Sequence, residues 1–183
     1  MVEKSEEKFL RVIGAAGTRE ILQFLDGHET VHYKELDEFI NTDTLNFRLR
    51  DFLRYNFVEH HVKRGEERKE WYTITNRGRK VLNCIEKCVS LVEDEAEFLQ
   101  LVGGKGTKEV LQFICERGQV QYKEFDVSVS VPTLNNRLSR LLDFSLVEHH
   151  FQKKPQRKEW YEITEKGIEM SKYLEDLVKL IDR

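Results

Sequence analysis

The sequence predicts a mainly α fold with small β-hairpins, an α+β class, built from two copies of one unit. Three observations predict it: a length of 183 residues, an internal repeat, and an order of apolar patterns that recurs in both halves. A chain of this length suffices for one medium domain or two small ones. We therefore expect one domain over residues 1–91 and a second over residues 92–183.

The internal repeat runs without a gap. The segment GTREILQF from Gly17 returns as GTKEVLQF from Gly106, 89 residues later, and RKEWY from Arg68 returns at the same offset from Arg157. A gapless match over such a distance is typical of a duplicated structural unit.

Within each copy, the spacing of apolar residues predicts three helices, a hairpin and a closing helix. In the first copy we expect helices over 18–26 and 33–40, a third helix after Asn41 or Thr42, and strands over 57–63 and 70–75. The second copy offers Ser130 as the equivalent cap, with Pro132 in the first turn. The expected inward residues of the first copy are Ile21, Leu22, Phe24, Leu25, Leu36, Phe39, Ile40, Leu45, Leu49, Phe52, Leu53, Tyr72 and Ile74.

The segment between the two copies has the pattern of one long helix. No Gly or Pro interrupts residues 79–102, and apolar residues recur there every three or four positions, at Val81, Ile85, Cys88, Val92, Ala96 and Leu99. The C-terminal segment repeats this spacing at Met170, Leu174, Leu177 and Ile181. We expect these two segments to pack the units together or to form a homodimer.

Several of the repeated motifs resemble a known family. Gly-Thr-x-Glu-Ile-Leu, Tyr-Lys-Glu-Leu, Thr-Leu-Asn-x-Arg-Leu, Val-Glu-His-His and Trp-Tyr-x-Ile-Thr-x-x-Gly resemble winged helix-turn-helix regulators of the HxlR and MarR kind, over about 17–82 and 106–171. The resemblance implies two tandem winged helix-turn-helix domains, each with its third helix as recognition element and its hairpin as wing. HxlR-type proteins are usually single-domain dimers, so this chain departs from them in joining two units covalently. Double-stranded DNA is the implied partner.

Helical geometry indicates which residues of the third helix face outward. They are Asp43, Phe47, Arg50, Asp51 and Arg54 in the first copy, and Pro132, Asn136, Ser139, Arg140 and Asp143 in the second. Asn136 and Arg140 can pair with adenine and guanine, whereas Phe47 and Asp51 suit an electronegative groove less well. The net charge is +4 across 132–158 and +2 across 43–69, so we expect the second copy to be the stronger DNA reader.

The residues expected to contact DNA lie on the third helix and the wing of each copy. They are Thr44, Arg48, Arg50, Arg54, Lys63, Arg64, Arg68 and Lys69, with Thr133, Asn136, Arg137, Arg140, Lys153, Lys154, Arg157 and Lys158. Two alternatives remain. The charges could only solvate an exposed helix and turn, or the chain could be a tandem winged-helix scaffold for protein partners. Phe47, Asp51, an outward Trp71 and a formal charge of −3 favour the scaffold.

Other residue patterns predict no further chemistry. We expect no enzyme, because no nucleophile, base and acid are arranged together, and no cofactor, because Gly103–Gly106 lacks the phosphate-loop spacing. Cys84 and Cys88 fall in an apolar stripe, and the paired histidines of each hairpin point to opposite strand faces, so we expect no metal. Three cysteines cannot form a closed disulfide framework, the N-terminus is charged, and no apolar run approaches about 20 residues. We expect a cytoplasmic protein away from the membrane.

Overall fold

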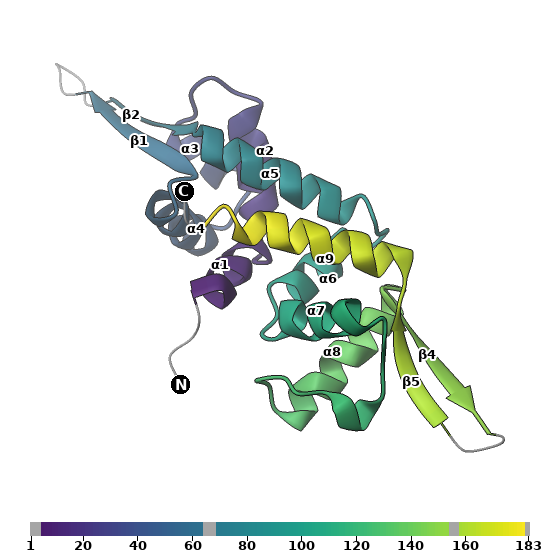
Figure 1. Cartoon of the computed structure of the whole chain (residues 1–183). Helices are drawn as coiled ribbons and strands as arrows, with labels where there is room; N and C mark the ends of the chain where they lie inside the picture. Colours follow the sequence, from purple (N-terminus) through teal and green to yellow (C-terminus); the bar gives the residue numbers. More distant parts are fainter. Residues whose placement is uncertain (1–4, 64–68, 154–157, 182–183) are drawn as a thin grey trace.

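The computed structural model describes residues 5–63, 69–153 and 158–181 (Figure 1). Within these residues the chain is a mixture of helices and two small antiparallel sheets, which confirms the α+β class. The first half contains α1 (Ser5–Ile13), α2 (Thr18–Asp26), α3 (Tyr33–Asp37), α4 (Thr42–Arg54), β1 (Val58–Lys63), β2 (Lys69–Ile74) and α5 (Asn76–Val89). The second half contains α6 (Glu95–Val102), α7 (Thr107–Arg117), β3 (Gln119–Val120), the 3-10 helix η1 (Tyr122–Glu124), α8 (Val131–Asp143), β4 (Val147–Gln152), β5 (Lys158–Ile163) and α9 (Glu165–Val178).

Most equivalent residues of the two copies adopt equivalent backbone conformations, although Gly118 lies in the left-handed region and its equivalent Glu29 does not. The hairpins have the same register, with Val58 opposite Ile74 and Val147 opposite Ile163. Just before each hairpin stands a residue in the left-handed region, with φ of 55° at Asn56 and 56° at its equivalent Ser145. The sequence offset of 89 residues therefore holds for the local structure as well.

The helix starts follow from capping side chains. Asn41 accepts hydrogen bonds from the backbone N–H groups of Asp43 and Thr44 at the start of α4, and Ser130 accepts one from Thr133 at the start of α8. Each satisfies a backbone donor that the first helical turn leaves without a partner. Of the two caps predicted for the first copy, Asn41 and Thr42, the structure has Asn41; the cap predicted at Ser130 and the position of Pro132 in the first turn are confirmed.

The single helix predicted over 79–102 is wrong. Helix α5 ends at Val89 and α6 begins only at Glu95, where the Asp94 side chain accepts a hydrogen bond from the backbone N–H of Glu97. After α5 the backbone hydrogen bonds span three residues instead of four: the Leu91 N–H donates to the Cys88 carbonyl and the Val92 N–H donates to the Val89 carbonyl. The apolar spacing therefore continues through a turn that lets α6 fold back against α1.

The second helix and two inward positions also differ from the prediction. Helix α3 ends at Asp37 rather than Ile40, and its equivalent in the second copy is only the short η1. Phe39 therefore lies beyond the helix and is 44% exposed, with its ring 4.9 Å from that of Phe24. Leu53 is 42% exposed because Leu45, Leu49 and Phe52 alone form the buried stripe of α4.

Within the described residues, two pairs of helices make most of the contacts between the halves. Helices α5 and α9 lie side by side and antiparallel, and Arg77 at the start of α5 donates a hydrogen bond to the Ile181 carbonyl beyond α9 (Figure 1). Helix α1 contacts α6 where two equivalent glycines, Gly14 and Gly103, bring their backbones together. Met170, Leu174 and Leu177 are buried and Ile181 is half-buried, so the stripe predicted to join the units packs inside the chain.

Candidate nucleic-acid interface

The hairpins and the third helices form the candidate interface in both halves. Helix α4 contacts β1 and α8 contacts β4, and the two hairpins extend from opposite ends of the molecule (Figure 1). On α4, Phe47, Arg50 and Arg54 are exposed as predicted, with Phe47 at 53%. The Arg50 guanidinium lies 4.9 Å from the centre of the Phe47 ring, a cation–π distance.

On α8, the structure separates the two residues that were predicted to point outward together. Asn136 is exposed, but Arg140 is half-buried against helix α6. Its Nη2 donates to the backbone carbonyl of Glu97 at 3.1 Å and lies 3.3 Å from the Glu97 carboxylate. The expectation that Arg140 is directed freely outward is corrected, because a carboxylate of the neighbouring helix holds it.

Two further predicted DNA contacts make equivalent hydrogen bonds within the chain. Arg48 donates from Nε to the Ala16 carbonyl at 3.1 Å, and its equivalent Arg137 donates to the Lys105 carbonyl at 3.0 Å. Arg48 also lies 3.0 Å from Asp51, which is half-buried rather than directed outward. Arg48 therefore joins α4 to the loop before α2, and Arg137 joins α8 to the loop before α7. Burial of the Arg137 guanidinium lowers its pKa below the ordinary value.

The threonines at the start of the third helices are half-buried. Thr133 Oγ1 lies 2.9 Å from Oγ of the capping Ser130. Thr44 lies in the first turn of α4, where its backbone N–H donates to Oδ1 of the capping Asn41. Both therefore belong to the start of a helix, where backbone N–H groups favour an anion.

A pair of contacts that the sequence analysis missed also positions the third helices. The Tyr33 hydroxyl donates to Asn46 Oδ1 at 3.0 Å, and the equivalent Tyr122 hydroxyl donates to Asn135 Oδ1 at 2.7 Å. Each tyrosine fixes α3 or η1 on the helix that follows. The available signal was that both tyrosines and both asparagines recur at the repeat offset.

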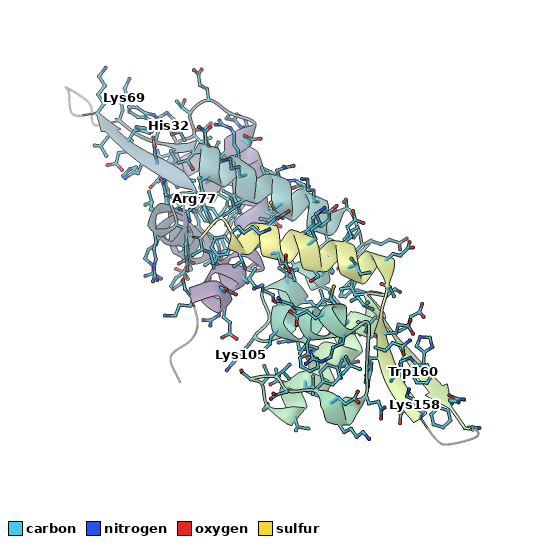
Figure 2. The ribbon with its side chains drawn as sticks, in the orientation of Figure 1. His32, Lys69, Arg77, Lys105, Lys158 and Trp160 are labelled. Carbon is cyan, nitrogen blue, oxygen red and sulfur yellow. The ribbon has the colours of Figure 1, made fainter. Side chains whose placement is uncertain are left out.

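The described ends of the hairpins are basic. In the first hairpin Lys63 is the cross-strand partner of Lys69. In the second hairpin Lys158 is the cross-strand partner of Gln152, and Lys153 follows Gln152 in the chain. All four lysines are exposed, and Figure 2 places Lys69 and Lys158 near the tips. The predicted contacts Arg64, Arg68, Lys154 and Arg157 lie outside the described residues.

The same aromatic pairs stack across both hairpins. The rings of His60 and Tyr72 lie 4.7 Å apart, and those of His61 and Trp71 lie 5.3 Å apart. The second hairpin repeats both pairs at 4.8 Å and 5.2 Å. Trp71 and the buried Tyr72 are adjacent residues and so lie on opposite faces of the strand, as predicted, and the Trp71 ring stacks on His61 of the neighbouring strand.

The remaining candidate groups have structural roles. Cys88 is buried, and burial raises the pKa of its thiol to about 12, which disfavours the reactive thiolate. In the part of the chain that the structure describes, no three His, Cys, Asp or Glu residues are arranged to hold a metal. Gly103 caps α6 and Gly106, with φ of 79°, precedes α7, so this loop stops one helix and starts the next, as predicted.

Comparison with other proteins adds no relative from which a site could be transferred. No protein-family model, curated protein or solved structure matches this chain. Over residues 5–63, 69–153 and 158–181, none of the helices has both the length and the apolar character that crossing a bilayer requires.

Proposed function

We propose that this chain is a sequence-specific regulator of transcription that binds double-stranded DNA. In this proposal residues 1–91 and 92–183 are two winged helix-turn-helix domains, α4 and α8 are their recognition helices, and the hairpins are their wings. The observation that carries the proposal is that each half places an exposed helix face beside a hairpin with a basic end. Such a helix fits the major groove, and hairpin cations can reach the flanking phosphates.

The charge at the first hairpin supports an anionic partner. Lys63 and Lys69 lie directly opposite each other, and like charges at such a position destabilise a hairpin. A phosphate backbone would relieve this repulsion because it neutralises both ammonium groups. The three cysteines are free thiols, which suits a reducing cytoplasm.

A tandem winged-helix scaffold for protein partners is the second candidate. The observation that favours it is Phe47, a large apolar side chain that is 53% exposed on a helix proposed to read DNA. Exposed aromatic residues are enriched at the centres of protein interfaces.

The salt dependence of binding to duplex DNA decides between the two candidates. We expect fluorescence anisotropy to give a linear fall of log affinity against log salt, with a steep slope from released counterions. Exchanging both Lys63 and Lys158 for alanine should reduce the magnitude of the slope of log affinity against log salt by about 2, because two phosphate contacts are lost. The matched control exchanges the exposed Lys80 and Lys172, on α5 and α9, for alanine and should leave the slope unchanged. Equal effects of the two pairs, or no binding at low salt, would exclude the regulator.

A further inference from the structure

We infer that the DNA site of this chain is an imperfect inverted repeat, read by Phe47 at a thymine in one half-site and by Asn136 at an adenine in the other. The inference rests on the proposed function and names the class of sequence that the chain selects. It follows from a symmetric arrangement of two helices that carry different side chains at equivalent positions.

Two contacts between the halves are reciprocal, whereas the hydrogen bond from Arg77 to Ile181 is not, because Lys166, the equivalent of Arg77, donates to Phe144 of its own half. Arg19 of α2 forms an ion pair with Glu95 at the start of α6, and the equivalent of Arg19, Lys108, lies 2.8 Å from Glu6, the equivalent of Glu95. Gly14 meets its own equivalent, Gly103, at the crossing of α1 and α6. Exchange of equivalent partners is the mark of an approximate twofold axis, so in the proposed complex α4 and α8 would enter the DNA in inverted orientations. Such an arrangement binds two half-sites in inverted orientation.

The reading faces of the two helices differ. Phe47 and Asn136 are equivalent and both are exposed, but one is apolar and the other is an amide. A phenyl ring can contact the methyl group of thymine, whereas an amide can pair with the N6 and N7 edge of adenine. Arg137 donates to Asn136 Oδ1 at 3.0 Å, which orients the amide and leaves this oxygen a second lone pair for a base.

The difference extends to the helices that support α4 and α8. Arg140 is held by Glu97, and the equivalent positions in the first half carry the opposite charges, Asp51 and Lys8. Lys8 and Asp51 line one groove together with Phe47. Asp51 is bound by Arg48 of its own helix, whereas Arg140 is bound by Glu97 of α6, so the two reading helices have different supporting contacts. Together with the difference between Phe47 and Asn136, this leads us to expect half-sites that differ in sequence.

The experiment selects bound sequences from a random duplex pool with the full-length chain. We expect two inverted half-sites that are not identical. Replacing thymine by deoxyuridine removes only the methyl group of the base. In the half-site that Phe47 reads, this change should weaken binding about fourfold, which is the factor that corresponds to the burial of one methyl group. Phe47→Asn should abolish this sensitivity, whereas Leu53→Asn, at another exposed apolar residue of α4, should preserve it.

A variant that combines Lys8→Glu, Phe47→Asn and Asp51→Arg gives the first half the second half's side chains at these three positions, while Arg50 and Arg54 still differ from Ser139 and Asp143. We expect it to select adenine in place of thymine at the position that Phe47 reads, with the change confined to one half-site. A perfect or directly repeated site for the unmodified chain, or no loss of affinity with deoxyuridine, would overturn this inference and leave the proposed function standing. Failure to enrich any sequence, with no binding at low salt, would overturn the proposed function itself.

Discussion

Gly14→Ala should be strongly destabilising because α1 and α6 touch through their backbones at this point. A Cβ on Gly14 would lie 2.2 Å from the Leu99 carbonyl oxygen and 2.5 Å from the Gly103 nitrogen. Neither is the flexible end of a side chain, so the helices must separate. Overpacking of this kind costs about 1–3 kcal/mol, and we expect the upper end for Gly14. Gly103→Ala should cost nearer to the lower end, because its Cβ would meet its closest neighbour at 3.0 Å.

Urea unfolding of the full-length chain measures this effect. With a slope of about 2 kcal/mol per M, a loss of about 3 kcal/mol lowers the midpoint by roughly 1.5 M. Gly27→Ala is the matched control, since its Cβ would meet nothing closer than 3.6 Å and its φ of −77° suits alanine. We expect the control to be neutral or more stable by about 0.4–1 kcal/mol. Equal midpoints for Gly14→Ala and Gly27→Ala would refute the close contact between α1 and α6.

Three further predictions concern charged groups. Glu97→Gln should raise DNA affinity by up to about fivefold, because it removes the ion pair of Arg140 and leaves only the hydrogen bond to the Glu97 backbone carbonyl. An unchanged affinity in anisotropy titrations would contradict the view that this ion pair competes with DNA for Arg140. Lys153→Ala should weaken binding to all duplexes alike and reduce the slope against log salt by about 0.9, while a loss confined to one sequence would contradict a phosphate contact. Hydrogen bonds from Arg19 hold the pKa of Glu86 below its ordinary value of 4.5, so the folded chain binds fewer protons here than the unfolded chain. The stabilisation is complete above pH 4.5 and is lost as the pH falls through the lower folded value. Urea midpoints between pH 6 and pH 3 should therefore fall less steeply for Glu86→Gln than for the unmodified chain.

Local signals in the sequence were sufficient for most of the elements. The cap at Ser130 and the alternation of Tyr72 and Ile74 are properties of neighbouring residues, and the structure has them as predicted. For the first copy the sequence left Asn41 and Thr42 as alternatives, and Asn41 is the cap. The break before α6 was also visible, since Asp94 followed three residues later by Glu97 has the form of a capping box. The uninterrupted apolar spacing concealed this break, because apolar residues recur at helical intervals across it although Val92 is half-buried and Ala96 is exposed.

The environment of the candidate site depends on contacts between elements, which spacing within one helix does not reveal. Arg140 lies on the outward side of α8 by helical geometry, yet Glu97 of α6 binds it. Comparison of the two copies offers a hint, because the equivalents of this pair, Asp51 and Lys8, both have the opposite charge. Paired changes of this kind point to a contact between the positions.

The number of chains in the DNA complex tests the central claim most directly. If one chain supplies both reading helices, sedimentation equilibrium with a selected duplex should give the mass of the duplex plus one chain of 21.8 kDa. The free protein should sediment as a monomer, because the stripe of Met170, Leu174 and Leu177 is already buried within the chain. A complex with two chains on one site, or no complex at all, would contradict the account.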